Sequence, residues 1–284
     1  MASLRRVVLN ADDLGFAPGV NRGILEAFEA GALSSASMMV NTPAFGDAAA
    51  IVRDRAPRLG VGLHLNFLTG APLSVAPTLC DPRTGTFFSL GTLAQRALSG
   101  RVSAGDVRRE CDAQLAALRD EAIGITHLDS HRHTHALPGV LPAVLASARD
   151  AGVRVVRRPI DVVVASAPVV TAKVMMLRAS WTAALRGVAS DDAALLARSP
   201  NFRGIALQGI PDVEHRLLEL LDRLPAGDTE IMMHPGHDDA VLAAQDPYRK
   251  ERERELRALC SLAVRERLQR GDLRLVRFDE LTEG

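Results

Sequence analysis

The chain has 284 residues, 47% of them hydrophobic and 4% aromatic, and its 34 basic side chains balance 34 acidic ones. This length can bury a substantial core as one domain, and the absence of net charge gives no indication of a nucleic-acid partner. The three cysteines lie far apart without CxxC spacing, which argues against a disulfide framework. The apolar segment near the N-terminus is too short for a signal peptide or a membrane span. We therefore expect a soluble, cytoplasmic, globular protein with a single domain over residues 1–284.

Short apolar or β-branched runs recur along the chain and predict eight strands. They lie at residues 6–10, 36–41, 60–66, 126–130, 154–157, 204–207, 230–234 and 273–278. Strands that alternate with helices predict a parallel sheet, and about 250 residues is the usual size of a closed (β/α)8 barrel. We therefore expect an α/β fold of the barrel-like, TIM-barrel type, with distortion allowed. An open doubly wound sheet is the alternative, but its usual GxGxxG fingerprint is missing after the first strand.

Helical spacing of apolar residues separates most of these runs. It predicts helices from Val20 to a C-terminal cap at Gly31 and over residues 107–122, 138–151, 212–224 and 249–270. Residues 68–89, rich in Pro, Thr and Gly, predict a long loop. Residues 161–200 show no clear pattern, so we assign them no structure.

Polar side chains follow the ends of several predicted strands, which is where barrel active sites are built. The first strand ends at Asn10 and is followed by two adjacent carboxylates, Asp12 and Asp13. Unless a cation lies between them, each carboxylate raises the proton affinity of the other. Alternatively, one of the two caps the helix that begins near Pro18.

Four of the eight histidines cluster at the end of the predicted fourth strand, within residues 127–135. If the chain stays extended there, one side carries His127, Asp129, His131, His133 and His135. Burying so many imidazoles without polar partners would be costly, and imidazole with carboxylate is the usual ligand set of zinc. The alternative is a solvated histidine-rich loop.

Three further positions carry candidate side chains. His64 lies between leucines on the third predicted strand and is either a core histidine or a metal ligand. His234, followed by Pro and Gly, marks a strand end and could be a ligand, a general acid or a structural residue. Arg157 and Arg158 either hold a carboxylate through paired hydrogen bonds or form a surface pair. Of these two, we expect Arg158 to contact the substrate.

These residues together predict a metal site at the ends of the first, third and fourth strands, with an acid from the seventh. A metal ion with an open coordination position supplies a nucleophile from water near neutral pH and polarises a carbonyl. The reaction class that follows is metal-assisted hydrolysis of an amide or ester.

Four segments resemble the YdjC-like carbohydrate deacetylase family, which includes chitooligosaccharide deacetylases and a deacetylase of hopanoid biosynthesis. They are residues 10–24 (NADDLG and PGVNRGI), 61–70 (VGLHL and LTG), 126–138 (THLDSHRHTHALP) and 233–236 (MHPG), with a weaker match at Tyr248, Arg252 and Glu255. The matches cover nearly the whole chain. Leu14 stands where the family usually has Phe, and Arg132 stands where a histidine is common.

The resemblance implies a barrel-like (β/α) fold and a metal-dependent hydrolase that removes an N-acetyl group from an amino-sugar-containing substrate. Its implied ligands to one divalent ion, zinc or magnesium, are Asp13, His64 and His131. Asp12 would be the general base, and His234 would protonate the leaving amine. The expected partner is a small N-acetylated sugar or glycoconjugate, with no nucleic acid and no membrane-spanning segment, and a homo-oligomer stays open.

Two alternatives remain at this point. One is another barrel metallohydrolase, an amidohydrolase or phosphoesterase. Those enzymes commonly carry a His-x-His pair after the first strand, where this chain has Asp12 and Asp13. The other is a non-catalytic sugar-binding relative, which has no need of a base and an acid such as Asp12 and His234.

Overall fold

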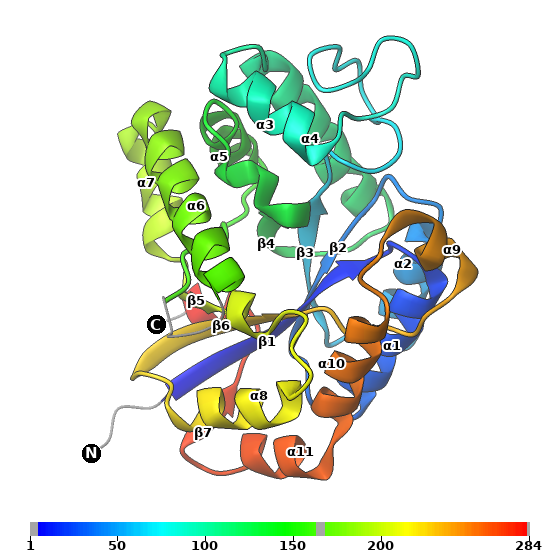
Figure 1. Ribbon diagram of the computed structural model, residues 1–284, viewed down its shortest axis with the longest axis vertical. Helices are drawn as coiled ribbons and strands as arrows, with labels where there is room; N and C mark the ends of the chain where they lie inside the picture. Colours follow the sequence, from blue (N-terminus) through cyan, green and yellow to red (C-terminus); the bar gives the residue numbers. More distant parts are fainter. Residues whose placement is uncertain (1–4, 163–167, 283–284) are drawn as a thin grey trace.

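A seven-stranded parallel sheet forms the centre of the computed structural model, which describes residues 5–162 and 168–282. The strand order is β4-β3-β2-β1-β6-β5, and β7 also pairs with β1. The strands are β1 (Arg5–Leu14), β2 (Ser35–Met38), β3 (Gly60–Leu65), β4 (Ile125–Ser130), β5 (Asn201–Arg203), β6 (Gly227–Met233) and β7 (Leu273–Leu275). The sheet curls, with helices around its outside (Figure 1). Parallel strands covered on both faces read as near-continuous apolar runs, which is why the sequence pattern located most of them.

The curled sheet forms a half-barrel that the segment at residues 154–157 does not close. This predicted strand pairs with β4 through a single bridge between Leu128 and Val156. On its other side, the segment is bonded to the residues before β5 by a side chain. The Ser199 hydroxyl donates to the Val156 carbonyl at 2.5 Å. The α/β barrel-like fold is thus confirmed in a distorted form, whereas the fifth predicted strand is wrong. The single domain over residues 1–284 stays a prediction.

The sixth predicted strand, at residues 204–207, is also wrong. The extended segment β5 ends at Arg203, and a 3-10 helix follows at Ile205–Leu207. Gly204 has a φ of 128°, and a Cβ there would lie 2.4 Å from the Met232 carbonyl oxygen. This backbone conformation strongly favours glycine, and it turns the chain out of the sheet.

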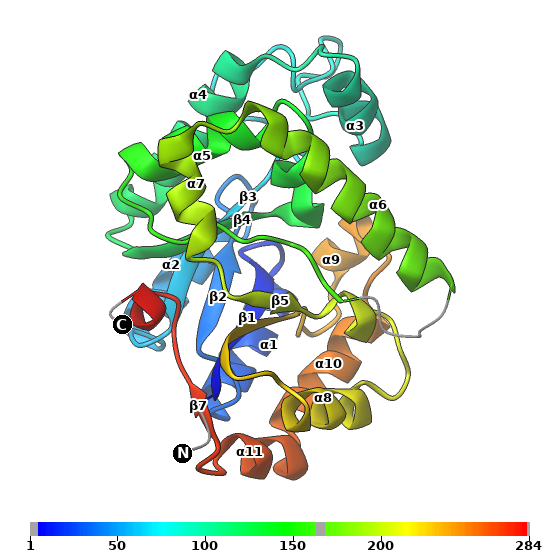
Figure 2. The ribbon, with the colours of Figure 1, turned by 90° about the vertical axis from the view of Figure 1, so that its left-hand side faces the viewer.

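Eleven α-helices in the described part of the chain surround the sheet (Figures 1 and 2). They are α1 (Pro18–Glu29), α2 (Phe45–Asp54), α3 (Leu90–Leu98), α4 (Ala104–Asp120), α5 (Leu141–Asp150), α6 (Pro168–Ala184), α7 (Ser190–Ala197), α8 (Val213–Asp222), α9 (Ala240–Gln245), α10 (Lys250–Cys260) and α11 (Leu262–Leu268). The predicted helix at residues 249–270 is two helices, because Ser261 is extended and its hydroxyl caps α11 by accepting from Val264 N. The unassigned segment 161–200 contains α6 and α7, and α2, α3 and α9 were not predicted. None of the helices described is long and apolar enough to cross a membrane.

Close packing between β3 and β4 depends on Gly62. The imidazole of His127 lies directly over this glycine and stacks on Phe278, with 3.9 Å between the ring centroids. The ring is held from both sides, because Ser37 and Thr126 hydroxyls bond its nitrogens at 3.0 and 2.9 Å. A Cβ at residue 62 would lie 2.4 Å from this ring, so the ring has nowhere to move.

We therefore expect Gly62→Ala to lower the free energy of unfolding by about 1–3 kcal/mol, the usual cost of overpacking a core. Urea unfolding of the wild-type protein and of the Gly62→Ala variant measures this loss. Gly124→Ala is the matched control, since a Cβ at Gly124 meets nothing within 4 Å. Equal unfolding midpoints for the two variants would contradict the close packing of His127 on Gly62.

Candidate active site

A β-bulge at the end of β1 brings two neighbouring carboxylates to one cavity. Ala11 pairs with Ala36 and Leu14 with Met38, so three steps along β1 oppose two along β2. Neighbouring side chains of a regular strand point to opposite faces, and a bulge re-aims one of them. Here Asp13 takes up the irregularity with a φ of 70°. Asp12 and Asp13 are both buried and both line the same cavity.

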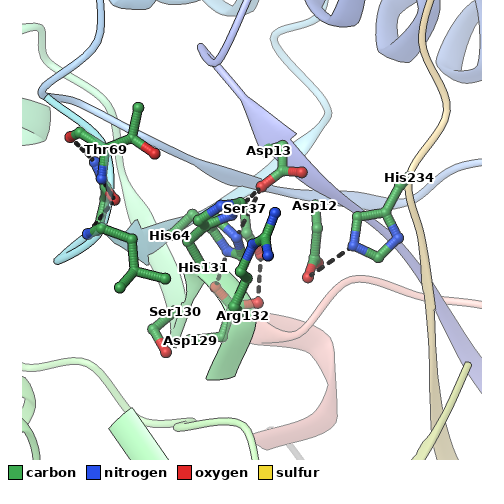
Figure 3. Close-up of polar contacts among 12 residues, drawn as sticks. Asp12, Asp13, Ser37, His64, Thr69, Asp129, Ser130, His131, Arg132 and His234 are labelled. Carbon is green, nitrogen blue, oxygen red and sulfur yellow. Dashed lines mark hydrogen bonds and ion pairs between the residues drawn. The ribbon is translucent and has the colours of Figure 1, made fainter. Parts of the chain in front are cut away.

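Asp13 meets two imidazoles from the neighbouring strands (Figure 3). Its Oδ1 lies 3.1 Å from His64 Nε2 and 2.8 Å from His131 Nδ1. His64 comes from β3, and His131 is the first residue after β4. One ligand atom from each of the three lies within 4.8 Å of the others, and all three side chains are buried. This set of two imidazoles and one carboxylate suits a divalent cation.

Asp129 fixes the orientation of His64. The two residues are partners in the register of β3 and β4, and His64 Nδ1 donates to Asp129 Oδ1 at 2.7 Å. Although burial opposes it, the charges of Asp129 and Asp12 raise the pKa of the His64 imidazole to about 10. With Nδ1 occupied, Nε2 is the nitrogen that faces Asp13. A carboxylate behind a ligating imidazole is a common partner that sets ring orientation.

Arg157 is completely buried among three carboxylates from three strands. Its Nη2 lies 2.7 Å from Asp12 Oδ1, 2.6 Å from Asp129 Oδ2 and 2.6 Å from Glu230 Oε1. Burial alone would lower the pKa of this guanidinium, but the three carboxylates raise it well above its usual value. Paired hydrogen bonds from Nη1 and Nη2 also grip both oxygens of Asp12. The arginine therefore sets the orientation of Asp12 directly and that of His64 through Asp129.

Asp12 keeps one acceptor position free, and it lies beside His234. Oδ1 accepts from Asn10 and from Arg157 Nη2, whereas Oδ2 accepts only from Arg157 Nη1 among the described residues. Each carboxylate oxygen has two acceptor positions, so Oδ2 retains one. His234 Nε2 lies 4.0 Å from this oxygen (Figure 3). Burial lowers the pKa of the His234 imidazole to about 4, so the ring is neutral near pH 7.

A second buried arginine, Arg252, holds the other oxygen of Asp13. Its Nη2 donates to Asp13 Oδ2 at 2.6 Å and to Asp246 Oδ2 at 2.9 Å. Burial would raise the pKa of Asp13, but the charges of His131 and Arg252 outweigh it and keep that pKa well below its usual range. Asp13 is therefore a carboxylate with one oxygen toward Arg252 and the other toward the two imidazoles.

Glu255 supports His234 from α10. It accepts the backbone N–H of His234 at 2.6 Å, and the Tyr248 hydroxyl donates to it at 2.5 Å. Burial raises the pKa of this carboxyl to about 7. The weak late match of the sequence, at Tyr248, Arg252 and Glu255, thus corresponds to residues that position His234 and Asp13.

A cavity of about 590 Å³ connects these groups. Strand ends, α6, α10 and the segment after β4 all contribute to its lining, with single residues from loops and α3. The lining includes Asp12, Asp13, His131, Arg132, His133, Lys173, Met176, Leu177, Gln208, His234, Tyr248 and Arg252. The cavity brings together the proposed base, the proposed acid and two of the three proposed ligands. His64 lies directly behind Asp13.

The expectation that all four clustered histidines face one side is wrong. The chain leaves β4 after Ser130 and forms a 3-10 segment, in which Arg132 and His133 have φ values of 52° and 56°. His127 instead packs between strands, and His135 bonds Ser130 and the Arg157 carbonyl. The capping alternative for the aspartates also fails, because the carboxylate of Asp239 accepts from Gly19 N at the start of α1.

Arginines 157 and 158 differ in burial. Arg157 is buried in the site, whereas Arg158 is exposed and is not among the cavity-lining residues. A substrate-binding role for Arg158 stays a prediction that no contact supports. Sequence reasoning missed Glu230 and Asp246. The position of Glu230 on the same face of β6 as Met232 was the available signal, since it places a carboxylate inside a buried strand.

Comparisons with known proteins agree with this arrangement. A family model described as YdjC-like protein matches residues 6–270. A carbohydrate deacetylase of Geobacillus stearothermophilus is 35% identical, over 97% of this chain and 98% of its own. Another from Brevibacillus brevis is 31% identical, over 97% and 99%. The chain therefore belongs to the YdjC-like family, as its motifs predict. A crystal structure from Enterococcus faecalis V583 has the same fold, with a TM-score of 0.77, 24% identity and coverage of 98% and 99%.

We expect Arg157→Met to lower the free energy of unfolding by about 3–5 kcal/mol, because it leaves buried carboxylates facing one another without their cation. Arg158→Met is the matched control and should change that free energy by less than about 0.5 kcal/mol, as exposed substitutions usually do. Denaturant unfolding measures both. An equally large loss of unfolding free energy in Arg158→Met would count against the buried network.

The same Arg158→Met variant tests the predicted role of Arg158 in substrate binding, because a raised KM would support that role.

Proposed function

We propose that this protein is a metal-dependent carbohydrate deacetylase that hydrolyses an N-acetyl group on an amino-sugar-containing substrate. The observation that carries the proposal is the free acceptor position of Asp12 Oδ2, which lies 4.0 Å from His234 Nε2 on a cavity that Asp13 and His131 also line. The relatives named carbohydrate deacetylase match over nearly their whole length, which supports the same reaction. The substrate we propose is a small N-acetylated sugar or glycoconjugate. Cytoplasmic location and a homo-oligomer stay predictions.

The donor set fits one divalent cation. Asp13, His64 and His131 would hold it, and the hydrogen bond to Asp129 already orients His64 Nε2 toward Asp13. A cation bound there would act as a Lewis acid on the acyl oxygen and on the attacking water. Two imidazoles and one carboxylate favour zinc by ligand preference, and magnesium is the alternative.

Asp12 is the proposed general base. Its Oδ2 would take a proton from the water that attacks the acetyl carbon. Arg157 holds both carboxylate oxygens at 2.7 Å, so the free position of Oδ2 keeps a fixed direction into the cavity. A base that is pre-oriented in this way contributes typically about 10²–10⁴-fold to the rate.

His234 is the proposed acid for the leaving nitrogen. Because burial lowers its pKa to about 4, it is neutral near pH 7 and must gain a proton during the reaction. Asp12 Oδ2 is the group placed to deliver the proton it takes from water, since hydrogen bonds between catalytic groups are often long before substrate binds. His234 would pass this proton to the nitrogen as the C–N bond breaks, leaving acetate and a free amine.

The two alternatives require different residues. An amidohydrolase or phosphoesterase barrel would carry its His-x-His pair after β1, where this chain has the Asp12-Asp13 bulge. A sugar-binding relative would need neither Asp12 beside His234 nor the arginine that orients Asp12. These differences favour the deacetylase.

Acetate release from a panel of N-acetylated sugars tests the proposal. Purified protein, loaded with zinc or with magnesium, is incubated with N-acetylglucosamine, its short oligomers and N-acetylated glycosides. We expect acetate and free amine in equal amounts, and loss of both with a chelator. A panel that yields no acetate with either metal would overturn the deacetylase and reopen the choice among hydrolases.

Substitution of each neighbouring aspartate separates the two proposed roles. Asp12→Asn should retain bound metal while turnover falls by about 10²–10⁴, because an amide cannot take the proton from water. Asp13→Asn should lose metal, because a charged ligand is replaced by a weaker neutral one. Elemental analysis and acetate release measure the two effects. The reverse pattern would mean that Asp13 is the base and Asp12 the ligand.

A further inference from the structure

His133 stands apart from the other histidines of the cluster because its ring has no hydrogen-bond partner among the described residues. Its Nδ1 is buried without a hydrogen bond, and none to either ring nitrogen is found within the described chain. His127 and His135, by contrast, each have both ring nitrogens bonded. His131 bonds Asp13. A buried polar group without a partner costs stability, so such a group is retained where something else supplies the partner.

The ring of His133 lies on the wall of the cavity described above. The residue is 7% exposed and lines that cavity with Asp12, Asp13 and His234. Its imidazole makes a T-shaped contact with Phe202, with 5.6 Å between the ring centroids and 87° between the ring planes. Phe202 is itself buried on β5 and lies beneath the guanidinium of Arg157. The ring is therefore held in place by packing alone.

The backbone also holds His133 in an unfavourable conformation. Its φ and ψ are 56° and 33°, and Arg132 before it has a φ of 52°. Two successive non-glycine residues in the left-handed region are uncommon, and strain of this kind concentrates at functional sites. This left-handed turn follows the end of β4. It places His133, two residues after His131, on the wall of the cavity.

We infer that His133 binds the substrate, donating a hydrogen bond to, or accepting one from, a sugar hydroxyl next to the acetamido group. This inference rests on the proposed deacetylase function. A hydroxyl can both donate and accept, so it satisfies an unpartnered imidazole nitrogen whichever tautomer the ring adopts. The contact adds no charge and leaves the proposed base, acid and metal ligands unchanged.

His133→Phe tests the contact with a ring of similar shape that cannot form a hydrogen bond. The substrate is the sugar of the panel that wild type deacetylates fastest. Its KM should rise about tenfold, which is the effect expected from the loss of one hydrogen bond. We expect kcat within about threefold of wild type. Metal content should not change, and the unfolding midpoint should fall by clearly less than in a variant that loses hydrogen bonds within the protein, because His133→Phe removes none of these. His133→Asn, which tolerates the left-handed backbone and keeps a polar group, should recover part of the KM.

His135→Phe is the matched control. It removes the bonds to Ser130 and to the Arg157 carbonyl, so its unfolding midpoint should fall. A similar fall in His133→Phe would show that the His133 ring is structural and would overturn the inference. An unchanged KM in a stable His133→Phe variant would overturn it as well. Wild-type protein that releases no acetate from any sugar would instead remove the proposed function on which the inference depends.

Discussion

The interaction on which the site depends is that of one buried guanidinium with three carboxylates. Asp12, Asp129 and Glu230 come from β1, β4 and β6, and Arg157 reaches all three within 2.7 Å. Buried charges of one sign are tolerated only where a counter-charge and hydrogen bonds offset their desolvation. Burial also raises the pKa of Glu230 to about 7, so this carboxyl is partly protonated near neutral pH. The network can therefore keep Asp12 oriented without gathering three full negative charges around one arginine.

Two neighbouring aspartates have different surroundings because each meets a different arginine. Arg157 grips both oxygens of Asp12, whereas Arg252 takes only Oδ2 of Asp13 and leaves Oδ1 to the imidazoles. The bulge in β1 makes this division possible, because regular pleating would send one of the two side chains to the opposite face. The proposed division into a base and a metal ligand would thus depend on one extra residue in a strand.

The sequence predicts most of the strands but not that the sheet stops at β4, next to residues 154–157. Apolar runs identify β1 to β4, β6 and β7. A strand of a covered parallel sheet is apolar over most of its length. The run at residues 154–157 has the same pattern, yet it makes only one bridge, Leu128 to Val156. The sequence pattern also could not predict which of Arg157 and Arg158 is buried, because their burial depends on how this segment pairs with β4. The left-handed turn at Arg132 and His133 was equally hidden, since neither residue type requires that conformation.

An account of hydrogen bonds assigns roles that the spacing of the histidines could not. His127 and His135 have both ring nitrogens bonded within the fold, so their polar atoms are fully used by the structure. His64 has one nitrogen committed to Asp129 and the other turned to Asp13, as expected of a ligand with a fixed ring. For a cluster that looks uniform in sequence, the distinguishing quantity is the bonding capacity that each ring retains after folding. A retained donor or acceptor that faces a cavity marks the side chain whose partner comes from outside the chain, because otherwise its burial would only lower stability.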